Sequence, residues 1–113
     1  MHELSLIEGI LGIANELAET HHAASIESIE LEIGTLANVE AEAFEFAWKA
    51  ATPATVLANA ERIIHHIPAT ARCMICNKEF EIAQYFDECP NCGSFRKEIL
   101  NGTGVKVKRI TLT

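Results

Sequence analysis

The first three residues, Met1-His2-Glu3, place an imidazole ring one residue from a terminal amine. The amine, the backbone nitrogen of His2 and one nitrogen of its ring can close fused chelate rings around one ion, with the amide or carboxylate of Glu3 near a fourth position. Such a nitrogen set suits Ni(II) or Cu(II) in a square-planar arrangement. Because His2 is bulky, we expect Met1 and its amine to stay in place. The alternative is an exposed histidine that binds nothing, and three residues alone do not exclude it.

A second group of candidate ligands lies in the last third of the chain. Cys73 and Cys76 form one C-x-x-C pair, Cys89 and Cys92 form another, and twelve residues separate the pairs. Two such turns can direct four sulfurs at one ion, which is the closed tetrahedral shell of a structural zinc site. A closed shell leaves no position for water or substrate, so this zinc is expected to hold structure.

Three other uses of these thiols remain to be weighed. Disulfides are disfavoured in the reducing cytosol. A redox pair needs one C-x-x-C at the start of a helix, whereas two matched pairs favour shared ligation. Iron held by four cysteines has the same ligand set, so it stays open beside zinc.

The residues between the pairs, 79–86, have the composition of a short hairpin that is too small to bury a core. Metal binding can replace that core, because about 10 to 16 kcal/mol is available to fold a structural zinc site. Loss of one cysteine is therefore expected to unfold residues 69–100. Four basic residues are placed to offset the negative charge of a zinc-thiolate centre: Arg72, Lys78, Arg96 and Lys97.

The elements that must position these ligands begin with a helix at residues 4–20. Its apolar residues recur at helical spacing, and they are Leu4, Ile7, Ile10, Leu11, Ala14, Leu17 and Ala18. His21 and His22 follow at the negative pole of this helix, where we expect them to be solvated.

A strand and a second helix follow. Apolar and acidic residues alternate over 29–33, and Gly34 ends that strand. Asn38 is the expected N-cap of a helix that Pro53 ends. Phe44 and Trp48 are four residues apart on its apolar face, so core packing is expected of both.

Two more strands complete the expected sheet. In residues 62–67, His65 and His66 point to opposite faces and are poor candidates for chelating one ion together. The last strand, 105–112, changes the parity of its apolar residues near Arg109, which predicts a bulge. If it lies beside strand 29–33, its lysines complement the glutamates there, the residues involved being Lys106, Lys108, Glu30 and Glu32. The pattern predicts an α+β fold, in which two helices pack on a small mixed three-stranded sheet. Residues 1–68 and 104–113 then form one domain, and a β-rich zinc-ribbon module, residues 69–103, is inserted in it.

Composition limits the function classes. The formal net charge of −7 argues against nucleic acid as the main partner, and the basic cluster Lys106, Lys108 and Arg109 is too small to reverse that. The chain lacks both an apolar run long enough to span a membrane and the pattern of a signal peptide, so we expect a cytoplasmic protein without a membrane partner. A nucleophile with a plausible base is also missing, which makes an enzyme a poor hypothesis.

The combination of these features resembles the HypA (HybF) family of nickel-insertion proteins. The likeness rests on Met1-His2-Glu3-Leu4-Ser5-Leu6, a strand ending in Ile33-Gly34, the two C-x-x-C pairs and a short basic-apolar last strand, and it covers essentially the whole chain. It implies a metallochaperone that delivers Ni(II) to the precursor of the [NiFe]-hydrogenase large subunit with the GTPase HypB, and in some organisms serves urease. The implied nickel ligands are Met1, His2 and Glu3, and the implied zinc ligands are Cys73, Cys76, Cys89 and Cys92.

The resemblance also marks a departure and leaves alternatives open. Relatives often carry acidic residues where this chain has His65-His66, so the role of these histidines is open. A monomer or a weak homodimer is expected. The competing hypothesis is a zinc-ribbon adaptor that mediates protein or nucleic-acid interactions without nickel transfer.

Overall fold

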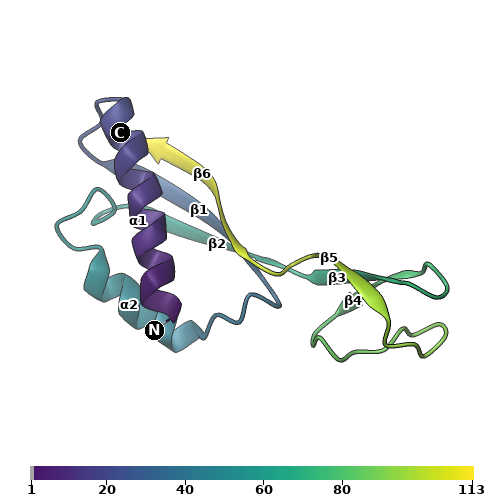
Figure 1. Cartoon of the computed structure of the whole chain (residues 1–113). Helices are drawn as coiled ribbons and strands as arrows, with labels where there is room; N and C mark the ends of the chain where they lie inside the picture. The colour runs from purple at the N-terminus through teal and green to yellow at the C-terminus, as the bar shows by residue number, and fades with distance from the viewer. Residues whose placement is uncertain (1) are drawn as a thin grey trace. The chain divides into compact units, whose positions relative to one another are not determined.

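The computed structural model describes residues 2–113 and contains two helices and two small sheets (Figure 1). The elements are α1 (His2–Thr20), β1 (Ile26–Gly34), α2 (Ala41–Ala51), β2 (Glu61–Ile67), β3 (Ala69–Cys73), β4 (Glu79–Ile82), β5 (Lys97–Asn101) and β6 (Val105–Leu112). The strand orders are β2-β1-β6 and β4-β3-β5. Among the described residues, none of the helices is long and apolar enough to cross a membrane.

The described residues divide into two compact units. Unit 1 comprises 2–31, 39–64 and 107–113, and unit 2 comprises Glu32–Asn38 and His65–Lys106. In the sheet β2-β1-β6, β1 and β2 run in the same direction and β6 runs against them (Figure 1). The expected fold class, two helices on a mixed three-stranded sheet with an inserted cysteine-bearing β module, is confirmed.

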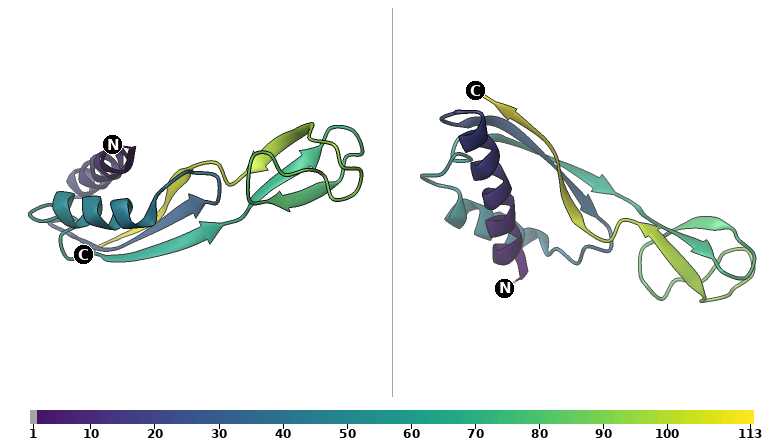
Figure 2. Two further views of the ribbon diagram at one scale, coloured as in Figure 1. Left: turned by 90° about the horizontal axis from the view of Figure 1, so that it is seen from below. Right: turned by 45° about the horizontal axis from the view of Figure 1, so that its top comes forward.

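Unit 1 buries the apolar stripe of α1 against its sheet. Both helices lie on the same face of that sheet (Figure 2). The residues of α1 that become buried are Ile7, Ile10, Ala14 and Ala18, and Ile29 and Leu31 of β1 face them from the sheet. Helical and alternating spacing predicted these residues, because each periodicity directs one face of an element toward the core. The predicted stripe of α1 was too wide, since Leu4 is exposed and Leu11 and Leu17 are half-buried.

The start of α2 differs from the prediction. Asn38 adopts a left-handed conformation, with φ of 58°, and it is not the N-cap. The cap is Glu40, whose carboxylate accepts hydrogen bonds from the amides of Glu42 (3.2 Å) and Ala43 (2.6 Å). The prediction was wrong because Asn is the commoner cap by residue type, whereas here the Glu40 carboxylate satisfies the first free amides of the helix.

Phe44 and Trp48 are both buried, as expected, and their ring centroids lie 6.0 Å apart. The side chain of Arg62 from β2 lies over both rings, at 5.5 Å from the Phe44 centroid and 5.0 Å from that of Trp48. Its guanidinium also pairs with Glu45. This cation–π contact joins α2 to β2, and sequence spacing gave no sign of it.

The last strand, β6, lies beside β1 as expected. Half-buried and exposed residues alternate along β6, and the alternation shifts by one position at Lys108 and Arg109, which are exposed in succession. One ion pair between the two strands joins Arg109 Nη1 to Glu30 Oε2 at 3.4 Å. At the end of β6, Thr113 bonds with Ser25 through both backbone and side chain.

Unit 2 is built on β3, which pairs antiparallel with β4 on one side and β5 on the other. Its core consists of Leu36, Ala69, Ala71 and Ile82, with Phe80 and Ile99 packed against it. The expected hairpin within 79–86 is wrong: residues 79–82 pair with β3, and Asp87 closes the turn that follows by accepting from the amides of Ala83 and Gln84.

The segment Glu32–Asn38 holds to the rest of unit 2 by a very close backbone approach. Gly34 donates to the carbonyl of Gly104 at 3.0 Å, and Leu36 donates to the carbonyl of Gly102 at 2.8 Å. A Cβ atom on Gly34 would lie 2.3 Å from the carbonyl carbon of Gly102. Gly102 is itself pressed on Ala69, where a Cβ would meet the Ala69 Cα at 2.4 Å. Backbones this close leave no space for a side chain at either glycine.

We therefore expect Gly34→Ala to lower the free energy of unfolding by about 2 kcal/mol, because the added methyl must push two backbone segments apart. Chemical denaturation followed by circular dichroism measures this. Gly104→Ala is the matched control, because a Cβ there meets nothing within 4 Å. Equal stability of the two variants would contradict the close-approach argument.

Candidate functional site

The two C-x-x-C pairs begin two turns of the same construction. In each turn, the residue after the second cysteine has a positive φ, and its amide donates a hydrogen bond to the carbonyl of the first cysteine. The amide of the first cysteine donates to the carbonyl of the residue two positions after the second cysteine. The four bonds are Asn77 to Cys73 (3.0 Å), Cys73 to Lys78 (2.8 Å), Gly93 to Cys89 (2.9 Å) and Cys89 to Ser94 (2.9 Å). We call residues 73–78 the first cysteine turn and residues 89–94 the second.

The two turns bring four sulfur atoms together. The Sγ atoms of all four cysteines lie within 4.8 Å of one another. Two cross-turn distances, Cys73 to Cys92 and Cys76 to Cys89, are both 3.6 Å. A tetrahedral zinc with bonds of about 2.3 Å needs sulfurs about 3.8 Å apart, so the spacing fits a metal shell. These sulfur–sulfur distances are much longer than the bond of about 2.05 Å in a disulfide, and the four cysteines are free.

The thiols in this cluster influence one another strongly. A hydrogen bond from the Asn91 side chain, 3.5 Å from the sulfur, is the largest of the effects that lower the pKa of Cys76 to about 6. The amide of Cys76 lowers the pKa of Cys73 in the same way. The Ser94 amide acts to lower the pKa of Cys92, yet the sulfur of Cys73 and burial outweigh it and raise that pKa to about 12. Four thiolates at this spacing repel one another, so complete ionisation requires a cation among them.

At the other candidate site, Met1 lies outside the described residues. His2 is the first residue of α1, and its side chain is exposed. The first amides of a helix have no partner within the helix, so the backbone nitrogens of His2 and Glu3 are free of the helical ladder. Oε2 of Glu3 lies 3.5 Å from Nδ1 of the His2 ring. The described residues of this candidate site therefore present a ring, two amides and one carboxylate in one place.

Glu3 is held by the start of α2. The backbone amide of Glu40 donates to Oε2 of Glu3 at 3.1 Å. This bond and the amide of Glu3 itself hold the pKa of the Glu3 carboxyl below its usual range. Sequence reasoning missed this anchor, and the only signal for it was the placement of Glu40 before an apolar-periodic run.

Comparisons with known proteins identify the family of this chain. Residues 1–112 match the family described as "Hydrogenase/urease nickel incorporation, metallochaperone, hypA". The chain belongs to the HypA family. A curated relative from Francisella philomiragia, named hydrogenase maturation factor HypA, is 41% identical over 110 residues, which are 97% of each chain. The protein of that name from Albidiferax ferrireducens is 38% identical over the same share of both chains.

Solved structures share the fold. The solution structure of the Ni metallochaperone HypA from Helicobacter pylori has a TM-score of 0.70 at 20% identity and covers 97% of this chain and 96% of its own. A second solution structure of a HypA protein has a TM-score of 0.72 at 22% identity and covers 100% of this chain and 97% of its own.

None of the described histidines of this HypA-family chain belongs to the cysteine cluster. His21 and His22 are exposed after α1, His65 is half-buried on β2, and the adjacent His66 is exposed. Among the described residues, the four cysteines form the only group of three or more His, Cys, Asp or Glu side chains close enough to share an ion. The structure gives His65 and His66 no joint metal site.

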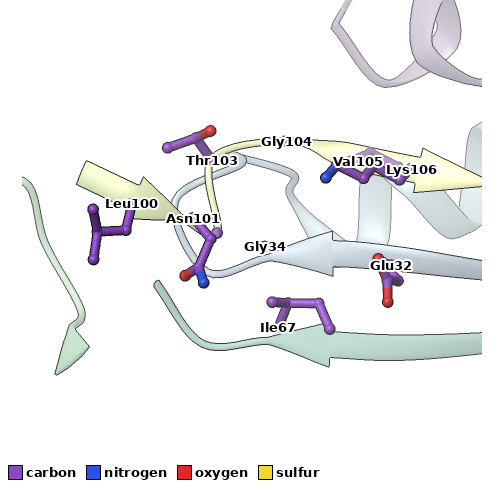
Figure 3. Close-up of a pocket in the computed structure, with 10 residues that line it drawn as sticks. Glu32, Gly34, Ile67, Leu100, Asn101, Thr103, Gly104, Val105 and Lys106 are labelled. Atoms are coloured by element: carbon purple, nitrogen blue, oxygen red, sulfur yellow. The ribbon is translucent and has the colours of Figure 1, made fainter. Parts of the chain in front are cut away.

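A hollow of about 250 Å³ in unit 2 lies where β1 and β2 end and β6 begins (Figure 3). Glu32 and Lys106 both line it. Ile67 and Leu100 add apolar walls. In this HypA-family chain the hollow is distinct from both candidate metal sites.

The second cysteine turn depends on Gly93, which has a φ of 76°. We expect Gly93→Ala to destabilise unit 2 by about 1 kcal/mol, because a side chain is strained in the left-handed region. The equivalent residue of the first turn is Asn77, with a φ of 64°, and Asn77→Gly is the matched control that removes such strain. Thermal unfolding in excess metal measures both. A Gly93→Ala variant as stable as Asn77→Gly would count against this account of the turns.

Proposed function

We propose that this chain is a nickel metallochaperone that binds Ni(II) at its N-terminus and delivers it to the precursor of the [NiFe]-hydrogenase large subunit. The observation that carries the proposal is that α1 begins at His2, so that its ring is exposed and its amide is free. The family supports it, since HypA proteins are described as incorporating nickel into hydrogenase or urease. The names of the relatives, hydrogenase maturation factors, favour hydrogenase as the recipient.

The proposed nickel ligands are the amine of Met1, the amide nitrogen and Nδ1 of His2, and one donor from Glu3. Nδ1 is the ring nitrogen nearest the main chain, so it closes a six-membered chelate ring with the amide of its own residue. The Glu3 carboxylate lies 3.5 Å from this atom and can serve as the fourth donor, with the amide of Glu3 as the alternative. Amine and amide donors suit a square-planar ion, and this preference matches Ni(II).

The location of this site suits a carrier. A helix end exchanges ligands one at a time, and a receiving protein can approach it directly, whereas a buried cage would hold its ion. The donors must lose protons before they bind, so nickel affinity falls as the pH drops. Copper binds such donors more strongly than nickel does, so selectivity comes from metal supply and partners. The protein carries metal and does not catalyse a reaction.

We propose zinc as the resident ion of the cysteine cluster. The thiolate donor set and its spacing fit zinc, which would hold the two cysteine turns together. All four ligands come from the protein, so the ion is structural. The GTPase HypB is the proposed partner in nickel delivery, and urease is the proposed second recipient. The proposed location is the reducing cytoplasm, where thiols stay free.

Nickel binding should require both the terminal amine and His2. We expect one extra residue before Met1, or His2→Ala, to weaken nickel binding at least about tenfold, a loss of about 1.4 kcal/mol or more. Isothermal titration of untagged protein with Ni(II) measures it. His66→Ala is the control, because His66 is also exposed but lies on β2. If the unmodified, extended and His2→Ala proteins all bind one equivalent of Ni(II) equally well, the chelate hypothesis is wrong and the adaptor hypothesis is favoured.

Zinc content tests the second site. Protein purified without added metal should hold one zinc, and Cys89→Ser should lose it, because three thiolates no longer close the shell. Hydrogen exchange should then show loss of protection in β3, β4 and β5 while α1 and α2 keep theirs, since metal binding supplies the folding energy of unit 2.

Pro90→Ala is the matched control for this experiment, because Pro90 is exposed and lies in the same turn without being a ligand. Iron in place of zinc in the purified protein would overturn the identity of the ion. Full protection of unit 2 in Cys89→Ser would overturn its structural role.

A further inference from the structure

Three large apolar side chains are exposed around the first cysteine turn. Met74 is 60% exposed, Ile75 is 59% exposed and Phe95 is 63% exposed. The amide of Met74 donates to the carbonyl of Arg96 at 2.9 Å, which holds the two chain segments side by side. Single exposed apolar residues are common on proteins, but several at one end of a small unit indicate an interaction surface.

Three basic residues lie at the same end of unit 2. Lys97 is opposite Cys73 in the β3–β5 pairing, Arg96 precedes it, and the carbonyl of Lys78 accepts from the Cys73 amide. Within the described chain, none of Lys78, Arg96 and Lys97 forms an ion pair with a carboxylate. The nearby Glu98 is engaged by Arg72 at 2.6 Å. Four thiolates and one Zn(II) would carry a charge of about −2, which these three cations more than offset, so positive charge remains available here on a chain whose net charge is −7.

A hollow of about 350 Å³ in unit 2 shares one residue, Met74, with the exposed apolar side chains. Its lining comprises Arg72, Cys73, Met74, Asn77 and Glu98. The volume is that of a small ligand pocket and can accept one or two side chains. Met74, which is flexible and polarisable, forms part of the wall and can adapt to different apolar groups.

We propose that this end of unit 2, which we call the tip surface (Met74, Ile75, Lys78, Phe95, Arg96 and Lys97), is a docking site for an acidic segment of a protein partner that anchors through apolar side chains. The unpaired cations attract acidic side chains and orient the segment. The hollow and the exposed apolar groups take its anchors. The proposal is independent of nickel binding.

A protein segment fits this surface better than single-stranded nucleic acid does. Nucleic acid sites of that kind pair a basic groove with several aromatic platforms for base stacking. Here Phe95 is the one aromatic member, whereas Met74 and Ile75 are aliphatic or thioether side chains that pack against apolar groups. Aliphatic anchors together with cations select an acidic, apolar peptide.

The test uses zinc-loaded full-length protein and a fluorescein-labelled synthetic peptide of about 12 residues in which Asp or Glu alternates with Leu or Phe. Two control peptides replace the acidic residues by Lys or the apolar residues by Ser. We expect only the first peptide to raise fluorescence anisotropy, with an affinity that falls as salt is added. Shifts in amide NMR spectra should map to the tip surface.

Variants locate the binding. Phe95→Ser and the double variant Arg96→Glu, Lys97→Glu should each weaken the peptide at least about tenfold, since they remove an anchor or reverse the attracting charge. Phe46→Ser on α2 and Lys108→Glu on β6 are the matched controls, because each changes an exposed residue of the same type in unit 1. They should bind as the unmodified protein does, and all variants should retain one zinc.

Several outcomes overturn the proposal. It fails if the acidic peptide does not bind, or if it binds the tip variants and the unmodified protein equally. It also fails if the NMR shifts gather at the Glu32–Lys106 hollow, or if an oligothymidylate binds the tip surface more tightly than the peptide. Concentration-dependent dimerisation that Phe95→Ser abolishes would identify the occupant as a second copy of the chain instead.

Discussion

Four cysteine sulfurs lie within 4.8 Å of one another, and the two cysteine turns of unit 2 are arranged around this cluster. At this distance thiolates repel one another, and the sulfur of Cys73 together with burial raises the pKa of Cys92, whereas the hydrogen bond from Asn91 lowers the pKa of Cys76. A dication converts that repulsion into attraction. The apolar core of unit 2 contains two alanines among its four buried residues, so the metal proposed at the cluster would add stability that this core is too small to supply.

The core of unit 2 also includes a residue from a distant part of the sequence. Leu36 follows β1 and is buried with Ala69, Ala71 and Ile82. It reaches that position because Gly34 and Gly102 let the backbones approach to a distance that no side chain permits. The close approach and the buried leucine therefore belong to one arrangement, in which glycine makes the space and Leu36 fills the core.

The nickel site proposed at the N-terminus differs from the cysteine cluster in how exposed its donors are. The cysteine cluster is closed, part-buried and held by matched turns, which suits an ion that stays. The N-terminal donors are exposed at the first turn of a helix, where amides have no helical partners, which suits an ion that must leave. The Glu40 amide fixes the Glu3 carboxylate at 3.1 Å. One side chain of the site is thereby positioned by packing while the His2 ring stays exposed.

Patterns that depend on neighbouring residues could be predicted from the sequence. The stripe of α1 and the alternation of β1 act over a few residues and predicted their elements correctly, and the two C-x-x-C pairs predicted the cluster of four sulfurs. Residue type and spacing also pointed to both candidate metal sites. What the tertiary structure decided involves residues far apart in sequence: the pairing of β4 with β3, the burial of Leu36 in unit 2, Arg62 over two aromatic rings, and Glu40 as both helix cap and anchor of Glu3. Such contacts depend on where the chain returns in space, and a local pattern does not carry that information.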